Sequence, residues 1–450
     1  MIKLLYLSLR NLTRNIKRNL ATGSAIAFGC AGILMLGAYN YRIDNLLRVF
    51  HVYVLHASHL SIFAPQGFEK FQYVPKKYSL NKEDQDLIIN TLRQNPNVEN
   101  FESQIRGSGL VGNGCMSYPF FAQGFEASKA SYISDHPQVK KWIPPRNYYN
   151  KGKSFGNYNS KIGAVELSNG LARALGKFNV HDETLDRSIN IVPCENVKKE
   201  VFSNDSNVQL LAGSWDGAMS AVDGEVVGLF STGFQESDSG ALTTSVDKLQ
   251  ELFATDHVSN IGVWIKDFHQ LDETKKQLEN SFKERNKNFE IISWNEERQS
   301  PYYVGTMEFL NTMVGFVGII LAVIVGFSVL NSTTMTVLER SQEIGMYRAM
   351  GFKKNQIVKL FIQESFCLSM ISLCFGICLG IVTIKLINHA HIIYYPPGAS
   401  GGINLMLILH WKFAVFTSFI LLILSLFVTQ ISVIYNLRGN IGDLVGGIRR

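Results

Sequence analysis

Residues 309–338 read FLNTMVGFVGIILAVIVGFSVLNSTTMTVL and contain no Asp, Glu, Lys or Arg. Lipid cannot hydrogen bond to exposed backbone groups, so a helix needs about 20 such residues to cross the hydrocarbon core of a bilayer. Three further uncharged stretches, rich in Leu, Ile, Val, Phe, Gly and Ala, lie at 19–41, 365–384 and 413–437. The sequence therefore predicts a membrane protein with four transmembrane α-helices.

The first of these stretches resembles a secretory signal, but it is longer than the usual apolar region of about 7–15 residues. No small-residue cleavage site follows it before Tyr41, and we expect a retained signal anchor. The predicted layout begins with an amphipathic helix at 1–18, a first span at 19–41, a large domain at 42–304 and a second span at 305–338. A charged helical segment at 339–360, a third span at 361–385, a loop at 386–411, a fourth span at 412–437 and a tail at 438–450 follow.

Basic residues predict the orientation, because Lys and Arg accumulate on the cytoplasmic side of membrane proteins. The loop 386–411 contains none. The segments at both ends and between the second and third spans contain Lys3, Arg10, Arg14, Lys17, Arg18, Arg340, Arg348, Lys353, Lys354, Lys359, Arg438, Arg449 and Arg450. We therefore expect both termini and 339–360 in the cytoplasm and the domain 42–304 outside. The net charge of +6 then reflects topology, and we expect no binding to nucleic acid.

The domain between the first two spans has the pattern of an α+β fold. An apolar run at 60–63, a helix beginning near Asn81 and a second apolar run at 98–101 form one strand-helix-strand unit. A second unit follows at 261–294. Two such units predict a ferredoxin-like body split by an insertion at about 107–257. The insertion is rich in Gly, Asn and Ser, which suggests short strands and loops.

The segment Glu339–Gly351, with sequence ERSQEIGMYRAMG, follows the second span directly. It reads as a short charged helix that ends where Gly351 permits a left-handed stop. A rigid, charged and exposed helix is what a loop needs to receive force from a soluble partner, although an ordinary solvated loop would also explain the charges. Ile344, Met346 and Met350 give this helix an apolar side that could fill a groove on such a partner.

These residues resemble the signature of the FtsX-like permease family of ABC transporters, which includes lipoprotein-releasing and MacB-like systems. The positions that match its spacing are Arg340, Glu343, Ile344, Gly345, Arg348, Ala349 and Gly351. Glu339 is a further candidate for coupling to the ATPase, and Glu364 occupies an acidic position at the foot of the third span. Residues 228–233 with Asp238, and an outer-loop motif, resemble the lipoprotein-releasing branch. That motif consists of Tyr395, Pro396, Pro397 and Gly398.

The resemblance implies a dimeric permease in the bacterial inner membrane, pairing with itself or with a homologous permease. Each permease engages an ABC ATPase subunit through 339–351, and ATP-driven closure moves the outer domains. ATP and Mg belong to the ATPase, and no cofactor or metal is expected on this chain. Gly152–Ser154 ends like a phosphate-binding loop, but Asn147 stands at the first glycine position, so we expect no ATPase activity here.

The leading substrate is a lipidated or amphipathic molecule such as a lipoprotein, held in an outer-leaflet cleft near Gly37, Tyr41 and Met307. Two alternatives stay open: a MacB-like exporter of peptides or small toxic molecules with an adaptor, and a scaffold that activates a cell-wall hydrolase. A pairing of Cys115 with Cys194 is also left open. Five histidines beside the spans are expected to be interfacial polar residues rather than metal ligands, namely His51, His56, His59, His389 and His391.

Overall fold

The computed structural model describes residues 16–143, 149–152, 154–157, 163–177, 194, 205–395 and 398–437. The chain divides into two compact units. The helical unit comprises Met1–Asp44, Thr306–Ile393 and Asn404–Arg450. The inserted domain comprises Asn45–Gly305 together with Tyr394–Ile403 from the loop between the third and fourth spans. The N-terminal helix predicted for 1–18 and the tail 438–450 fall almost entirely outside the described residues.

Within the described part of the chain, four helices are long and apolar enough to cross a membrane, which confirms the predicted number of spans. They are α2 (Ile16–Val49), continued by the π-helix η1 (Phe50–Val54), then α12 (Pro301–Glu339), α14 (Lys354–His389) and α15 (Trp411–Asn436). At about 1.5 Å per residue, α12 is almost twice as long as the hydrocarbon core is thick. The helices therefore extend beyond the charge-free stretches, and the first runs well past residue 41.

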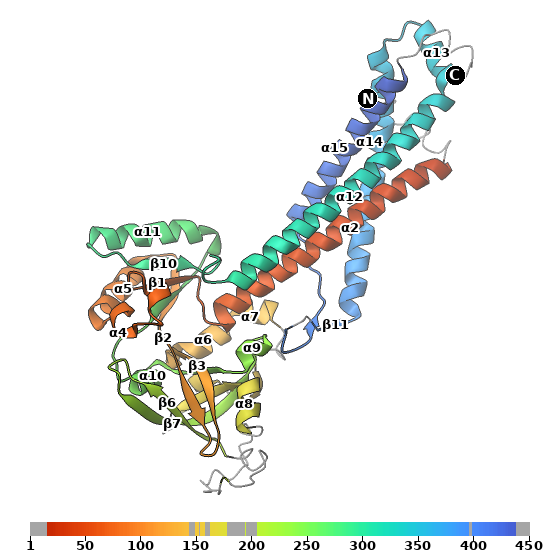
Figure 1. Ribbon diagram of the computed structural model, residues 1–450. Helices are drawn as coiled ribbons and strands as arrows, with labels where there is room; N and C mark the ends of the chain where they lie inside the picture. The colour runs from red at the N-terminus through yellow and green to blue at the C-terminus, as the bar shows by residue number, and fades with distance from the viewer. Residues whose placement is uncertain are drawn as a thin grey trace. The chain divides into compact units, whose positions relative to one another are not determined.

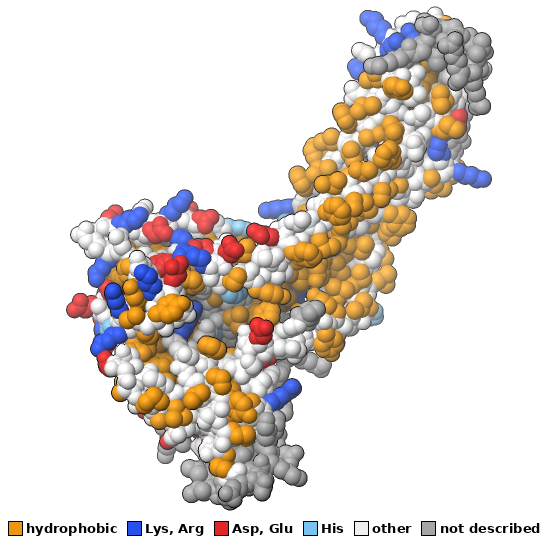
Figure 2. Space-filling view, in the orientation of Figure 1, with side chains coloured by type: hydrophobic (Ala, Val, Ile, Leu, Met, Phe, Trp, Pro, Cys, Tyr) orange, Lys and Arg blue, Asp and Glu red, His pale blue; other side chains and the backbone are white. Residues whose placement is uncertain are grey.

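The outer surface of the helical unit is apolar over most of its length (Figure 2). On α12, Phe309, Phe316 and Ile319 are each more than 60% exposed. Inside the unit, small residues permit close helix packing, as their spacing predicts. A Cβ added at Gly376 of α14 would lie 2.8 Å from the backbone oxygen of Ala27 in α2. An apolar outer surface over closely packed helices is typical of a protein that is surrounded by lipid.

The inserted domain contains the predicted split ferredoxin-like body. Strands β1 (Leu60–Phe63), β2 (Val98–Gly112), β9 (Asn260–Ile265) and β10 (Glu290–Ser293) lie in the order β10-β1-β9-β2. The helix α5 (Lys82–Gln94) connects β1 to β2, and α11 (Leu271–Glu284) connects β9 to β10 (Figure 1). The two helices contact each other. The side chain of Asn81 accepts a hydrogen bond from Asp84 N–H at 2.8 Å and caps α5.

The insertion contains longer strands than its Gly-rich composition suggested. β2 is 15 residues long and passes from the ferredoxin-like body into the insertion, where β3 (Ser117–Phe125) pairs with it. The sheet continues through β8 (Ala241–Ser245), β5 (Ala164–Ser168), β7 (Met219–Phe230) and β4 (Tyr149–Gly152), while β6 (Asn207–Gly213) pairs with β2 and β7. The expectation of short strands is confirmed for β4, β5 and β8, which have four or five residues. It is wrong for β3 and β7, with 9 and 12 residues, because pairing across the sheet stabilises extended chain that local composition does not favour.

The remaining elements are short. They are α3 (Gly67–Lys70), α4 (Pro75–Tyr78), α6 (Ala127–Ser134), α7 (Pro137–Trp142), η3 (Phe155–Asn157), α8 (Asn169–Leu175), α9 (Gln235–Asp238), α10 (Val246–Phe253), η5 (Phe268–Gln270), α13 (Ser341–Ala349), β11 (Ile393–Tyr394) and β12 (Ile403–Asn404).

Candidate functional site

The charged segment after the second span forms the helix α13, a separate element between two long helices. It covers Ser341–Ala349. Gly351 follows with φ of +91°, a left-handed conformation that strains any residue with a Cβ. A Cβ at Gly351 would meet no atom within 4 Å, so backbone conformation rather than crowding selects glycine here. α14 then begins at Lys354.

Two ion pairs attach this segment to neighbouring helices. The Arg18 guanidinium of α2 lies 2.7 Å from the Glu339 carboxylate at the end of α12. Arg340, which precedes α13, donates from Nη1 to both carboxylate oxygens of Glu364 in α14, at 2.9 and 3.1 Å. Both members of the second pair are nearly buried. Arg340 and Glu364, which the sequence singled out separately, therefore act together, and the partner of Arg340 lies within this chain.

Ile344 does not present its side chain to a partner, and that expectation was wrong. It is 2% exposed and packs with Val337, Ile357, Phe361 and Val433 from three helices. Helical periodicity cannot tell whether an apolar face is covered by the same chain or by another one.

The residues of α13 that remain accessible are different ones. Met346 and Met350 are 53% and 60% exposed, and Phe352 just beyond the helix is 47% exposed. Glu343 and Arg348 are half-buried, and Gly345 is buried. The accessible surface is thus a methionine-rich patch formed by Met346, Met350 and Phe352, flanked by charge.

Hydroxyl groups connect the spans near this segment, and the sequence analysis missed them. The hydroxyls of Ser369 in α14 and Ser425 in α15 lie 2.8 Å apart. The Thr429 hydroxyl of α15 donates to the Ser365 hydroxyl of α14, also at 2.8 Å. Thr334 of α12 lies 2.9 Å from Ser432 of α15. Such bonds hold helices together where water is absent. The signal that could have revealed them is the concentration of Ser and Thr in otherwise apolar spans.

The loop between the third and fourth spans joins the sheet domain, where it lies beside residues 231–235. Gly398 O accepts a hydrogen bond from Gln235 N–H at 2.9 Å, and Ser400 N–H donates to Gly233 O at 3.1 Å. The hydroxyls of Ser231 and Ser400 lie 2.7 Å apart. Tyr395 is 76% exposed, and Pro396 and Pro397 lie outside the described residues. The structure thus brings together two motifs that were recognised separately in the sequence.

Asp238 fixes the conformation of this contact from the domain side. Its carboxylate accepts hydrogen bonds from Thr232 N–H at 2.6 Å, from the Thr232 hydroxyl at 2.7 Å and from the Ser231 hydroxyl at 3.1 Å. Asp238 is 4% exposed. A buried carboxylate with three donors is a stable arrangement that orders the loop around it.

Two of the three residues predicted to line a substrate cleft contact the fourth span. A Cβ at Gly37 would lie 2.0 Å from the Phe413 ring of α15. Tyr41 stacks on His410 at the start of that helix, with ring centroids 4.5 Å apart. Both residues therefore face the fourth span, while Met307 is half-buried on α12. The Asn40 side-chain amide of α2 donates a hydrogen bond to Asn311 Oδ1 of α12 at 2.7 Å.

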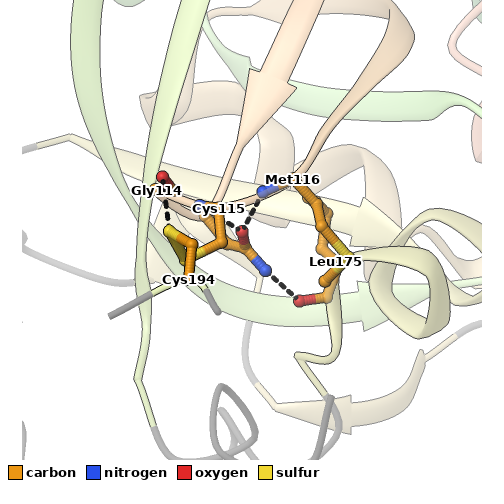
Figure 3. Close-up of a disulfide and its surroundings, with 6 residues drawn as sticks. Gly114, Cys115, Met116, Leu175 and Cys194 are labelled. Atoms are coloured by element: carbon orange, nitrogen blue, oxygen red, sulfur yellow. Dashed lines mark hydrogen bonds between the residues drawn. A yellow bond between two sulfur atoms is a disulfide. The ribbon is translucent and has the colours of Figure 1, made fainter. Parts of the chain in front are cut away.

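A disulfide joins Cys115, in the turn after β2, to Cys194 (Figure 3). The Asn113 side chain organises the turn by accepting from Cys115 N–H and Met116 N–H and donating to Leu175 O at 2.8 Å. The pairing that the sequence left open is thereby present, and it closes a loop across 79 positions.

The histidines after the first span each have a different partner. His51 lies 2.6 Å from the Ser300 hydroxyl, and His56 lies 3.1 Å from the Glu102 carboxylate. His59 Nδ1 accepts from Ile265 N–H, and burial lowers the pKa of His59 to about 3. Among the described residues, no group of three or more His, Cys, Asp or Glu side chains could hold a metal ion.

Comparison with known proteins identifies a family domain in the C-terminal part of the chain. Residues 315–441 match the model of the FtsX-like permease C-terminal domain. The macrolide export ATP-binding/permease protein MacB of Bdellovibrio bacteriovorus is 23% identical over 50% of this chain and 36% of its own length. The pyoverdine export ATP-binding/permease protein PvdT of Pseudomonas putida is 25% identical over 56% and 39%. The lipoprotein-releasing system transmembrane protein LolC of Buchnera aphidicola is 23% identical over 50% and 49%.

The chain thus covers less than half the length of each of these three relatives. The family match begins inside α12 and ends just beyond α15, so it includes α13, Gly351 and the Arg340–Glu364 pair. The residues on which the sequence resemblance rested lie mostly within it. Residues 315–441 of this chain therefore form an FtsX-like permease C-terminal domain.

Proposed function

We propose that this chain is the permease component of an ABC transporter, with both termini and α13 in the cytoplasm and the sheet domain outside. An ABC ATPase, expected on a separate subunit, binds at the methionine-rich patch on and beside α13. The chain itself binds no ATP, Mg or other cofactor. It works as a dimer, with a second copy or with a homologous permease.

One observation carries this proposal: α14 connects the segment around α13 to the loop that contacts residues 231–235. At its beginning it holds Arg340 through Glu364. At its end it continues into Tyr394–Ile403, which belongs to the compact unit of the sheet domain. A displacement of α13 would pass along a continuous 36-residue helix to the loop that contacts residues 231–235. Packed helices move as rigid elements, and such elements transmit motion between distant sites.

The disulfide supports the proposed orientation, because disulfides persist in oxidising compartments and are rare in the cytosol. Labelling of single cysteines in whole cells tests it. Tyr395→Cys should react with an impermeant maleimide, whereas Lys353→Cys should react only after the cells are permeabilised. The reverse pattern would contradict the orientation.

The proposed substrate is lipidated or amphipathic, such as a lipoprotein, because LolC is named for a lipoprotein-releasing system. A small-molecule exporter working with an adaptor is the second candidate, because MacB and PvdT are named for macrolide and pyoverdine export. A photocrosslinking residue at Met307 separates the two. Gly37 is unsuitable for this purpose, since any side chain there collides with Phe413. Capture of a lipoprotein supports the first candidate, and capture of an adaptor supports the second.

The proposed binding of an ATPase at the methionine-rich patch is tested by placing the same photocrosslinker at Met346. It should capture an ATP-binding protein in membranes, and removal of that protein should abolish substrate release. Capture of a cell-wall hydrolase, with no release of any substrate, would instead favour a signalling scaffold.

A further inference from the structure

The sheet domain encloses a cavity of about 340 Å³ that the proposed transport mechanism does not use. Its volume falls within the range of about 300–1,000 Å³ that is usual for small-molecule sites. Six of the 21 residues that line it are phenylalanines, namely Phe68, Phe121, Phe125, Phe155, Phe230 and Phe234. Residues from η1 and from the loop that contacts Gly398–Ser400 complete it.

A row of polar side chains crosses the floor of this cavity, and strand register places it there. Arg106 on β2 is paired with Gln123 on β3, Gln123 with Thr243 on β8, and Thr243 with Glu166 on β5. Directly paired residues point to the same face of a sheet. The four side chains therefore line one face, with a base and an acid about 14 Å apart across three strand spacings. Phe121 and Phe125 flank Gln123 on that face.

The two ends of the row differ in how their charges are satisfied. The Glu166 carboxylate accepts from Phe155 N–H at 2.6 Å and from the Thr243 hydroxyl at 2.9 Å. Burial raises the pKa of Glu166, and these two hydrogen bonds only partly offset that rise. Its two oxygens are thus already occupied by groups of the same chain, and it offers little to a ligand.

Arg106 presents the opposite case. Its backbone N–H donates to Ser259, but its guanidinium has no hydrogen-bond or ion-pair partner among the described residues. Burial lowers the pKa of Arg106 to about 10. The neighbouring Gln123 side chain is likewise without a partner in the described part of the chain. Arg106 is half-buried and lines the cavity, and a guanidinium that is shielded from water without a partner is stabilised when an anionic group pairs with it.

We propose that this cavity binds a small amphipathic anion, with its carboxylate or phosphate on Arg106 and Gln123 and its apolar part among the phenylalanine rings. A guanidinium forms two parallel hydrogen bonds with either of these anionic groups. A zwitterion is disfavoured because Glu166 is already satisfied. This proposal does not rest on the proposed transport function, since binding is measured on the chain alone.

Calorimetry tests this on the full chain in phosphatidylcholine nanodiscs, with empty discs subtracted. The probes are decanoate and decyl phosphate, with decanol, decyltrimethylammonium and inorganic phosphate as comparisons. We expect one saturable site for at least one of the two amphipathic anions. Binding of decanoate alone identifies a carboxylate ligand, and binding of decyl phosphate alone identifies a phosphate ligand. Equal affinity for decanol, for the cation or for inorganic phosphate would overturn the proposal.

Variants locate the site. Arg106→Gln should weaken anion binding at least tenfold, and Phe121→Ser, at a side chain 73% exposed, should weaken it about threefold to tenfold. Arg93→Gln, at an exposed arginine of the same domain, should change nothing. Undiminished binding by Arg106→Gln would refute the assignment. If that variant fails to fold, Arg106→Lys keeps the charge without the planar fork, and it should bind the anions more weakly but still prefer them to decanol.

Discussion

Arg340 and Glu364 form an ion pair that joins the start of α13 to α14, with two hydrogen bonds of 2.9 and 3.1 Å. Their side chains are only 12% and 11% exposed. A pair so well shielded from water is costly to break, because the remaining charge loses its partner. The pair therefore helps to hold α13 against the third span, together with the packing of Ile344 on Ile357 and Phe361.

The first prediction concerns that contact. Glu364→Gln should loosen α13 at a local cost of about 1–3 kcal/mol, and lower the stimulation of ATP turnover by substrate several-fold in nanodiscs. The exchanged variant Arg340→Glu with Glu364→Arg should recover part of the loss, because the opposite charges meet again. Lys385→Gln, exposed near the other end of α14, serves as the control. Full coupling in Glu364→Gln would show that the pair has no part in transmission.

The second prediction concerns the accessible patch beside it. Met346→Asp should reduce co-purification of the ATPase at least tenfold, because a charge replaces an exposed apolar contact, and the chain's melting temperature should stay unchanged. Met219→Asp alters a methionine of β7 that is 78% exposed, and it should leave binding intact. Ile344→Asp, in contrast, should destabilise the helical unit itself, since it buries a charge within the chain. If Met346→Asp retains the ATPase, α13 is only a connector.

The third prediction concerns the buried carboxylate beneath the loop contact. Asp238→Ala removes the acceptor of three hydrogen bonds and should release residues 231–235 from Gly398–Ser400. Hydrogen exchange should then accelerate at the amides of Gln235 and Ser400, whose protection depends on this contact. Asp223→Ala, at an exposed position of β7, should leave both amides protected. Unchanged exchange in Asp238→Ala would mean that the loop is ordered by other contacts.

The fourth prediction concerns the disulfide. Cys115→Ser with Cys194→Ser should lower the stability of the inserted domain by about 2–4 kcal/mol, because the open chain gains conformational entropy when it unfolds. Chemical denaturation followed by tryptophan fluorescence measures this loss. In protein isolated without reductant, mass spectrometry should find both thiols protected from maleimide. Reactive thiols at both positions would contradict the pairing and, with it, the support it gives to the orientation.

The fifth prediction concerns pH. The pKa of His59 is about 3 in the fold, chiefly through burial and then through the charges of Arg48 and His136. In the unfolded chain it is about 6.5. Between these values the unfolded state binds a proton that the folded state does not, so stability falls as pH decreases below 6.5, by up to about 1.4 kcal/mol per pH unit.

His59→Gln keeps an acceptor for Ile265 N–H and should flatten this dependence between pH 7 and pH 5. His269→Gln, at an exposed position of η5, should leave the slope as it is in the unaltered protein. Denaturation curves at pH 7, 6 and 5 measure both. Equal slopes in all three proteins would show that His59 is protonated in the fold.

Local properties of the sequence determined the framework of this protein. Four charge-free stretches were sufficient for the spans, because the membrane imposes a minimum length on any apolar helix. The two strand-helix-strand units were recognisable because short apolar runs and an N-cap such as Asn81 depend only on residues close together in the sequence. The segment 339–351 was likewise recognisable from its own spacing.

Only the tertiary structure decided which of those residues meet. Ile344 is covered by helices of its own chain, Arg340 is paired across 24 positions with Glu364, and Cys115 across 79 with Cys194. Arg106 lies in one row with Glu166 because three strand registers align them. Such contacts depend on the packing of elements distant in the chain, and periodicity within an element carries no information about the surface that will cover it.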